Sequence, residues 1–217
     1  MISALIFDFD GTILDTEFAE FHAVREVFEQ HDALLDRNRW QRVVGTDAAH
    51  GFWFPWLQEQ SERVGFDAVV ADARARKYDL ISELQPLPGV ITLLDAAGRA
   101  DVPLAIASSS PQSWVAPHLE RLGLRDRFAV VRCRDHVANA KPSPDLYTAA
   151  CDAIGANPRE SVAIEDSRNG VLAAKAAGLR CVVCPNSTTE GMDMSAADLL
   201  VHSLVDVTLE RLADLVG

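Results

Sequence analysis

Leu5-Ile6-Phe7-Asp8-Phe9-Asp10-Gly11, near the start of the chain, is the stretch that decides the fold. Its first residues are apolar at both alternating positions, so a strand formed here is apolar on both of its faces. That pattern is typical of a central parallel strand that is covered on two sides, rather than of an amphipathic edge strand. The run ends in two acids, which places carboxylates at its carboxyl end.

Apolar runs of the same kind recur along the chain. They lie at residues 102–107, 128–131, 161–164 and 180–184, with a weaker run at 199–201. Helical patterns lie at 90–100, 113–122, 144–154, 169–177 and 205–216, and several of them end in a glycine that suits a helix C-terminus. This alternation predicts an α/β fold with a doubly wound, Rossmann-like parallel sheet and right-handed crossovers.

Residues 16–85 interrupt the alternation. This segment has no convincing strand pattern, and its Leu, Val, Phe and Trp residues are spaced as in amphipathic helices. A linker rich in proline at residues 85–89 then returns the chain to the sheet. We therefore predict a core of residues 1–15 and 86–217, with an all-helical domain of residues 16–85 inserted after the first strand.

The composition is acidic. Lys and Arg number 20 against 32 Asp and Glu, which gives a formal net charge of −12. Nucleic acids and anionic membranes are bound mainly through Lys and Arg, so we expect neither as a partner. The first residues lack the basic and apolar regions of a secretory signal. We expect a soluble, cytoplasmic protein that is a monomer or a weak dimer.

Two of the four cysteines, Cys181 and Cys184, have the spacing of a zinc or redox pair. They lie in a predicted strand, where residues three apart point to opposite faces. Two such thiolates cannot hold one metal ion, so we interpret both as buried structural cysteines.

Polar side chains cluster at the carboxyl ends of the predicted strands or in the loops that follow them. They are Asp8, Asp10, Ser108, Lys141, Glu165 and Asp166. In an open parallel sheet these ends face one crevice, where ligands bind. Each residue alone could be a helix cap, but their convergence predicts a functional site.

Four segments in this order resemble the four motifs of the haloacid dehalogenase superfamily. They are Asp8 to Glu17, the strand end at Ser108, Lys141-Pro142-Ser143-Pro144-Asp145, and Ile164 to Gly170. The likeness is greatest to the phosphatase and β-phosphoglucomutase-like branch, which carries a helical cap between the first two motifs. The resemblance covers nearly the whole chain and implies phosphoryl transfer through an aspartyl-phosphate, with Mg²⁺ as the cofactor.

The resemblance gives the acids their roles, and their chemistry fits. Asp8 is expected to be the nucleophile and Asp10 the general acid and base. Mg²⁺ is expected to be held by Asp8, the backbone carbonyl of Asp10 and Asp166, with Glu165 acting directly or through water.

The remaining motif residues are expected to bind phosphate. Ser108, the backbone N–H of Ser109, and Lys141 would neutralise its oxygens. Gly11 allows a close turn after the nucleophile, and Thr12 is expected to bond behind it.

Five polar residues near the motifs are interpreted as mainly structural. Ser110 and Asp15 are given no direct role, and Asp145 is expected to cap or support the helix that begins near it. Ser167 and Asn169 are expected to orient the acidic loop.

The cap departs from the mutases of this branch. Those sequences usually have a histidine where this chain has Glu20, and an arginine where it has Asp47-Ala48-Ala49. Lys77 is the best remaining cationic residue of the cap. Without a second phosphate clamp a bisphosphate would be held poorly, so we predict hydrolysis of a small phosphorylated substrate, with a sugar-phosphate mutase as the alternative.

Other readings are less consistent with the sequence. Relatives that cleave carbon–halogen or carbon–phosphorus bonds generally lack the second acid, present here as Asp10. A phosphoacceptor module without turnover uses similar strand-end residues but has no need of Asp10 or of the helical insert.

The aromatic residues Phe52, Trp53, Phe54 and Trp56 are interpreted as cap core, with a substrate-facing or dimer surface as the alternative.

Overall fold

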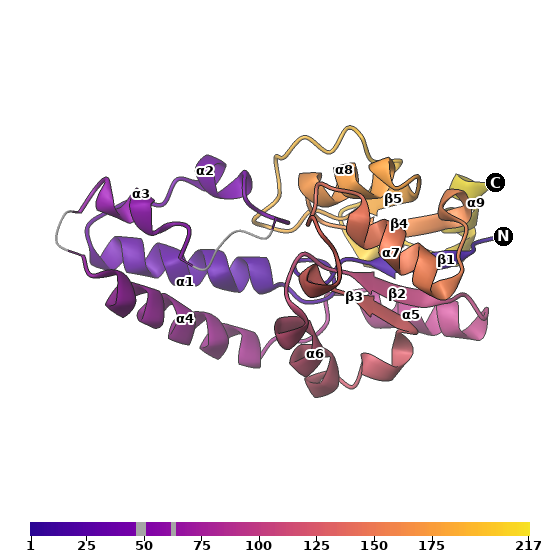
Figure 1. The fold of residues 1–217 in the computed structure, drawn as a ribbon, viewed down its shortest axis with the longest axis horizontal. Coiled ribbons are helices and arrows are strands. Elements are labelled where there is room, and N and C mark those ends of the chain that lie inside the picture. Colours follow the sequence, from indigo (N-terminus) through magenta and orange to yellow (C-terminus); the bar gives the residue numbers. More distant parts are fainter. Residues whose placement is uncertain (47–50, 62–63) are drawn as a thin grey trace.

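The computed structural model describes residues 1–46, 51–61 and 64–217, which form a sheet-based core and a helical cap (Figure 1). The parallel strands pair in the order β3, β2, β1, β4, β5, β6. In chain order they are β1 (Ala4–Phe7), β2 (Leu104–Ala107), β3 (Val130–Arg132), β4 (Ser161–Glu165), β5 (Arg180–Val183) and β6 (Leu199–Leu200). The predicted parallel sheet is confirmed.

The first strand lies in the middle of the sheet. Phe7 pairs in register with Ile106 of β2 on one side and with Ile164 of β4 on the other. Leu5 packs into the apolar core on one face of the sheet and Ile6 into the core on the opposite face. The absence of a polar face in this strand therefore reflects its burial on both sides.

Helices cover both faces of the sheet. They are α5 (Val90–Arg99), α6 (Gln112–Arg121), α7 (Asp145–Ile154), α8 (Arg168–Ala176) and α9 (Leu209–Val216). Leu94 of α5, Leu119 of α6 and Leu212 of α9 share the apolar cluster of Leu5. Leu146 of α7 and Val171 of α8 share the cluster of Ile6. The sheet is therefore wound with helices on two sides, as predicted.

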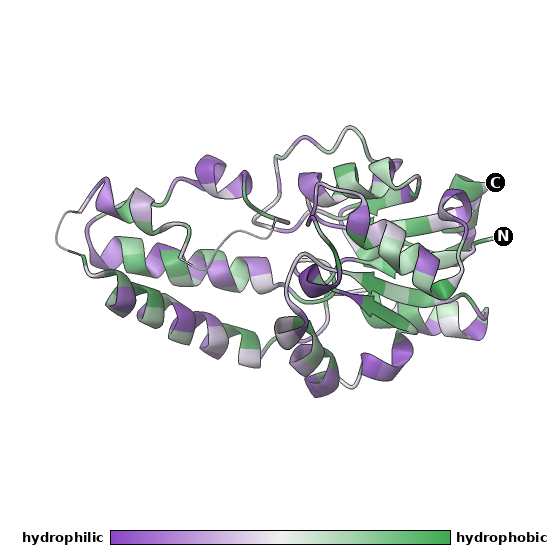
Figure 2. Cartoon of the chain, in the orientation of Figure 1, coloured by the Kyte–Doolittle hydropathy of each residue, from purple (hydrophilic) through white to green (hydrophobic). Residues whose placement is uncertain are grey.

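The helical cap lies between the first two strands in sequence. It contains α1 (Thr16–Gln30), α2 (Arg37–Gln41), α3 (Phe54–Gln58) and α4 (Phe66–Ser82). Helices α1 and α4 lie side by side (Figure 1), and both carry apolar and polar residues, whereas the strands of the sheet are mostly apolar (Figure 2). Mixed helices of this kind bury one stripe against each other and expose the other.

The aromatic residues of the insert belong mainly to the cap core. Trp53 and Phe54 are buried together with Trp40, while Phe52 and Trp56 are half-buried against the same cluster. The interpretation as cap core is confirmed for Trp53 and Phe54, whereas Phe52 packs against this core and also lines a cavity.

The last helix is shorter than the predicted 205–216. Leu204–Asp206 forms a 3₁₀ turn, and α9 begins at Leu209 because the Thr208 hydroxyl accepts a hydrogen bond from the backbone N–H of Arg211 at 3.2 Å. The third strand also begins later than the predicted 128–131 run, and Phe128 is a core residue that precedes it. Apolar character alone does not distinguish a residue of a strand from a buried residue that precedes the strand in the sequence.

The cysteines of the fifth strand region do not form a pair. Cys181 packs into the core on one face of the sheet, and Cys184 packs against the core on the other face. All four cysteines are free. Cys184 is half-buried rather than fully buried, so the prediction is correct for their opposite orientation and for the burial of Cys181.

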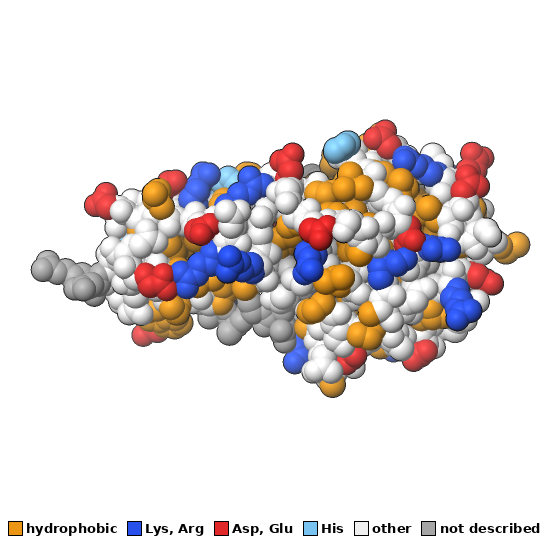
Figure 3. All heavy atoms as spheres, turned by 90° about the horizontal axis from the view of Figure 1, so that it is seen from above, with side chains coloured by type: hydrophobic (Ala, Val, Ile, Leu, Met, Phe, Trp, Pro, Cys, Tyr) orange, Lys and Arg blue, Asp and Glu red, His pale blue; other side chains and the backbone are white. Residues whose placement is uncertain are grey.

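No helix within the described ranges is long and apolar enough to span a membrane. On the face drawn in Figure 3, Lys and Arg side chains are interspersed with Asp and Glu side chains along both the core and the cap. The acidic net charge of the chain is therefore not apparent on this face.

Candidate active site

Polar side chains from four segments meet at the carboxyl ends of the central strands. Asp8 follows β1, Ser108 follows β2, Glu165 ends β4, and Lys141 lies in the loop after β3. All four are buried, and Asp8, at 6%, is the most exposed of them. The sheet thus brings together residues from motifs that are far apart in the sequence.

Lys141 is enclosed by acids. Its Nζ donates to Asp8 Oδ1 at 2.5 Å and to Glu165 Oε1 at 2.6 Å, and it lies 5.0 Å from the ring centroid of Tyr147. Burial acts to lower the pKa of Lys141, but the attraction of Asp8 and Glu165 outweighs it and raises the pKa above that of a free lysine. Lys141 is therefore positively charged at neutral pH.

Glu165 is held by hydrogen bonds on both carboxylate oxygens. Oε1 accepts from Lys141 Nζ and from Tyr147 Oη, the latter at 2.7 Å. Oε2 accepts from the backbone N–H groups of Asp166 and Ser167 and from the Ser167 hydroxyl. Because both oxygens have protein donors, this geometry suits Glu165 better to positioning Lys141 than to direct coordination of a metal ion.

Asp8, Glu165 and Asp166 form a compact acidic group. Each has a carboxylate oxygen within 4.8 Å of the others. Burial raises the pKa of Asp8 to about 8 against the opposite effect of Lys141, and Glu165 and Asp10 add to the rise. Burial, followed by Glu165 and Asp8, also raises the pKa of Asp166 well above its usual value.

The charges of this group fit a divalent cation. If all were ionised, the three carboxylates and the ammonium of Lys141 would carry two net negative charges. A hard cation with oxygen ligands, such as Mg²⁺, would neutralise them and would favour the ionised form of Asp8. The acidic group therefore suits the predicted cofactor in both charge and donor type.

Asp166 is fixed beside the turn that follows Asp8. Asn186 Nδ2 donates to Asp166 Oδ2 at 2.8 Å and to the Gly11 carbonyl at 3.3 Å. Gly11 has a φ of +82°, and a Cβ there would lie 2.4 Å from Asp166 Oδ2, so a larger residue would displace the carboxylate. Thr12, expected to bond behind Asp8, contacts Asp166 instead, with its hydroxyl 3.5 Å from Oδ1.

Asp10 accepts hydrogen bonds from three parts of the chain. Its Oδ1 accepts from the Thr16 hydroxyl at 2.7 Å and from Trp114 Nε1 at 2.8 Å. Its Oδ2 accepts from the hydroxyls of Ser110 at 2.6 Å and Ser108 at 3.4 Å. Ser110 and Thr16 thus contact a predicted catalytic residue directly, which the sequence did not indicate.

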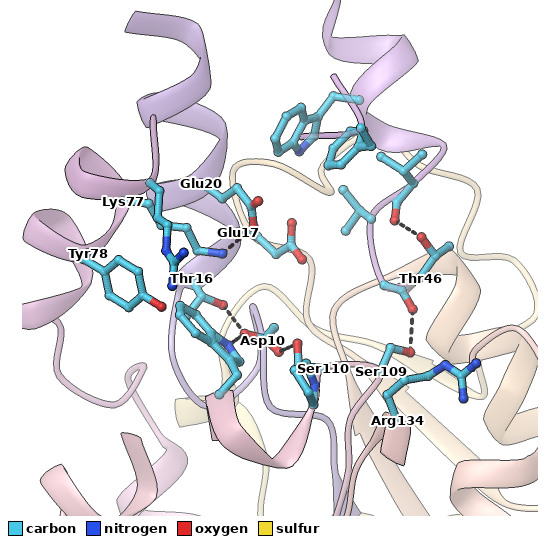
Figure 4. A pocket seen from close by; sticks show the side chains of 18 residues that line it. Asp10, Thr16, Glu17, Glu20, Thr46, Lys77, Tyr78, Ser109, Ser110 and Arg134 are labelled. Atoms are coloured by element: carbon cyan, nitrogen blue, oxygen red, sulfur yellow. Dashed lines mark hydrogen bonds and ion pairs between the residues drawn. The ribbon is translucent and has the colours of Figure 1, made fainter. Parts of the chain in front are cut away.

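A cavity of about 610 Å³ lies between the cap and the core. Figure 4 shows Glu17, Glu20 and Lys77 of the cap facing Asp10 and Ser109 of the core across this space. Phe52 of the cap core also lines it. Asp8 does not line the cavity and is almost fully buried.

The charged groups of the cap largely compensate one another. Lys77 Nζ lies 2.7 Å from Glu20 Oε2. Burial acts to lower the pKa of Lys77, but attraction to Glu20 outweighs it and raises the pKa. Burial also raises the pKa of Glu17, with Glu20 and Asp10 adding to the rise. The predicted cationic residue of the cap therefore has a carboxylate partner already.

Comparison with known proteins agrees with this geometry. The family described as haloacid dehalogenase-like hydrolase matches residues 5–184. The chain belongs to this family. The resemblance inferred from the four motifs is confirmed, and so is the prediction of a hydrolase of the phosphatase type.

Relatives of this hydrolase include phosphatases and mutases. YhcW of Bacillus subtilis is 39% identical over 216 residues, which cover 99% of this chain and 97% of YhcW. A phosphorylated carbohydrates phosphatase of Thermotoga maritima is 33% identical over 180 residues, or 82% of each chain. The β-phosphoglucomutase of Bacillus subtilis is 33% identical over 219 residues, which cover 97% of this chain and 94% of the mutase.

A solved structure resembles this hydrolase over nearly its whole length. A CbbY variant from Rhodobacter sphaeroides, in complex with xylulose-(1,5)bisphosphate, has a TM-score of 0.73 and 30% sequence identity. The match covers 95% of this chain and 96% of CbbY. The core and cap therefore have the architecture of a known member of the family.

The structure revises the expectation for Asn169 in this hydrolase. Asn169 contacts the cap rather than the acidic loop, because its Nδ2 donates to the Val44 carbonyl at 2.8 Å. The Ser109 hydroxyl makes a second contact of this kind, to the Gly45 carbonyl at 2.9 Å. Residues 47–49, which stand where the mutases of this branch usually have an arginine, lie outside the described residues.

Two other acids near the motifs have structural partners. Asp15 Oδ1 accepts from the backbone N–H of Phe18 and caps α1. Asp145 accepts from the hydroxyl of Ser143 and from Asn139, so it braces the loop that carries Lys141 rather than capping α7 through a backbone N–H.

Three residues of the site escaped the sequence analysis: Trp114, Tyr147 and Asn186. Asn186 follows the apolar run at 180–184, so its place after a predicted strand was the signal that pointed to it. Trp114 and Tyr147 lie on predicted helices, and no local pattern distinguishes them from ordinary packing residues.

Proposed function

We propose that the protein is a Mg²⁺-dependent phosphomonoester hydrolase that acts on a small phosphorylated metabolite through an aspartyl-phosphate at Asp8. The observation that carries this proposal is the arrangement of Asp8 between Lys141 and Asp166, with the carboxylate of Asp10 nearby on the wall of the cavity. One buried cation and an acidic group at the strand ends suit the binding of phosphate beside a metal ion.

In the first half of the proposed reaction, Asp8 attacks phosphorus. A bond forms from an Asp8 oxygen to phosphorus, the bond from phosphorus to the leaving oxygen breaks, and Asp10 gives that oxygen a proton. In the second half, Asp10 takes a proton from water, whose oxygen attacks phosphorus and releases Asp8. Lys141, Ser108 and the backbone N–H of Ser109 would stabilise the phosphate oxygens in both halves.

The metal ion would be held by Asp8, Asp166 and the backbone carbonyl of Asp10, with Glu165 acting through its contact with Lys141. Bound there, Mg²⁺ would offset the repulsion between the carboxylate of Asp8 and a phosphate dianion. Hydrogen bonds from Asn186 and Thr12 hold Asp166 in place for that task.

A sugar phosphate is the substrate class that we favour. One relative is a phosphorylated carbohydrates phosphatase, and a CbbY structure of the same fold holds a sugar bisphosphate. Hydrolysis is favoured over phosphate transfer between sugar positions because Lys77, the cap cation predicted as a second phosphate clamp, is paired with Glu20. Arg74 is a second cap cation that lines the cavity.

Phosphate release from a panel of phosphorylated metabolites and from 4-nitrophenyl phosphate, with Mg²⁺ or with EDTA, tests the proposal. We expect multiple turnovers that require the metal ion and disappear in Asp8→Asn. At most one phosphate released per chain would instead indicate a phosphoacceptor module.

A further inference from the structure

Trp114 lies between Asp10 and the cap. On one side its Nε1 donates to Asp10 Oδ1 at 2.8 Å. On the other side the ring contacts cap helix α4, with Lys77 Nζ 4.3 Å from the indole centroid and the Tyr78 ring at 5.8 Å. His118, one turn later on α6, packs against the indole at 4.6 Å. One side chain therefore joins the predicted general acid to the domain that covers the cavity.

The hydrogen bond from Trp114 differs in kind from the others at Asp10. The hydroxyls of Thr16, Ser108 and Ser110 can rotate, and each can accept as well as donate. An indole N–H can only donate, in a direction fixed by the ring. Trp114 therefore keeps Oδ1 as the acceptor and leaves Oδ2 facing the hydroxyls of Ser110 at 2.6 Å and Ser108 at 3.4 Å, the latter on the side of the proposed phosphate site.

The contact between Trp114 and the cap depends on the position of α4. Asp8 is only 6% exposed, so binding of a substrate at Asp8 requires a rearrangement of the residues around it. Lys77 is itself fixed by Glu20 at 2.7 Å, and it faces the indole only while α4 is in its present position. Opening of the cap would thus remove a contact that holds the indole against Asp10.

We propose that Trp114 is a positioning residue of this hydrolase, which orients Asp10 for proton transfer to the leaving group and is itself held in place by Lys77 and Tyr78 of the cap. The inference rests on the proposed function of Asp10. This role explains why Asp10 is bonded to an indole whose opposite side contacts the cap. With Trp114 held in this way, protonation of the leaving group would be most efficient when the cap covers the substrate.

Trp114→Phe tests the inference, because it removes the N–H and retains an aromatic ring against Lys77, Tyr78 and His118. We expect kcat/KM for an alkyl phosphate to fall roughly ten- to a hundredfold, less than the full worth of acid catalysis. The kcat/KM for 4-nitrophenyl phosphate should change by less than about threefold, because its leaving group needs little protonation. We compare kcat/KM because it reports the transfer of phosphate to Asp8, whereas kcat also includes the attack of water, which is the same for both esters.

A matched control is Trp56→Phe. Trp56 also carries a cation on its ring, with Arg39 at 4.6 Å, but it is packed in the cap core away from Asp10. This variant should hydrolyse both esters like the wild type. A selective loss for the alkyl ester in Trp56→Phe would show that an indole without a contact to Asp10 has the same effect, and the inference would fail.

Two further variants separate positioning from general damage. In an Asp10→Asn background, Trp114→Phe should cause no additional loss for the alkyl ester, since both changes remove the same function. Lys77→Met should cause a smaller selective loss for the alkyl ester. Because this change lies in the cap, it leaves the core intact and tests the inference even if Trp114→Phe folds poorly. Equal losses for alkyl and aryl esters in Trp114→Phe, or an additive double variant, would overturn the inference. Absence of turnover in the wild type would instead refute the proposed function.

Discussion

The ammonium of Lys141 lies 2.5 Å from Asp8 Oδ1, although the two residues follow strands that are two positions apart in the sheet. β2 separates β3 from β1, and the loop after β3 carries Lys141 back across the strand ends to reach Asp8. Both side chains are buried, so this contact is shielded from solvent. The predictions below follow from this pair and from the groups around it.

Asp8→Asn should abolish turnover and leave the fold intact. A carboxamide has nearly the same volume but is a far poorer nucleophile and metal ligand. Because burial raises the pKa of Asp8 to about 8, loss of its charge should not lower the thermal midpoint of the metal-free protein. Phosphate release and thermal unfolding check this, and activity within tenfold of the wild type would refute the role of Asp8.

Asp10→Asn should slow turnover by about two to four decades, the usual worth of general acid and base catalysis. Mg²⁺ binding should persist, because the backbone carbonyl remains. The loss of kcat/KM, which reports the leaving-group step, should be smaller for aryl phosphates than for alkyl phosphates, since aryl leaving groups need little protonation. Kinetics with both esters and calorimetric titration of Mg²⁺ test the assignment, and equal losses for the two esters would count against it.

Lys141→Met should strongly destabilise the protein. It leaves Glu165 buried without its cationic partner, a change that costs about 3–5 kcal/mol for a broken buried ion pair. Lys175→Met is the control, because the Lys175–Asp198 pair is partly exposed and Asp198 keeps its contact with Arg180. Urea unfolding should show a loss of about 1 kcal/mol or less for the control. Similar losses in both variants would contradict the prediction.

The stability of the metal-free protein should fall as the pH rises from about 4 to about 8. In that range the unfolded chain has released the proton of Asp8, whose pKa is raised from 3.8 to about 8 on folding, so each pH unit favours the unfolded state. The slope is at most about 1.4 kcal/mol per pH unit for one such carboxyl. Saturating Mg²⁺ should flatten the slope by favouring ionised Asp8.

Urea unfolding at several pH values, with EDTA or with Mg²⁺, measures this dependence. Asp8→Asn should reduce the slope in EDTA, because its side chain carries no titrating proton. A metal-free stability that rises between pH 5 and pH 8 would show that Asp8 is ionised in the folded state without a metal ion.

Glucose 1-phosphate with Mg²⁺ and a bisphosphate primer should yield free phosphate and no 6-phosphate. A mutase must hold a second phosphate in the cap, and Lys77 is already paired with Glu20 there. Measuring phosphate and 6-phosphate in the same reaction decides between the two activities. Isomer formation faster than phosphate release would establish the mutase, with Lys77 as the first residue to test.

The sequence by itself determined the class of the fold and the position of its main chemistry. The apolar run before Asp8 could be assigned to a central strand because burial on both faces leaves no polar position in it. The residues at the strand ends could be selected because parallel strands present their carboxyl ends at one edge of the sheet. Both arguments use local patterns whose consequences are fixed by backbone geometry.

The tertiary structure decided which of those residues touch and what else joins them. Nothing near Lys141 in the sequence indicates that it bridges Asp8 and Glu165, and nothing near Trp114 indicates its contact with Asp10. These contacts join residues at least 24 positions apart, and they depend on how the loops and the cap pack. Local periodicity shows that a side chain is buried, whereas its partner is set by packing between distant segments, which only the folded chain defines.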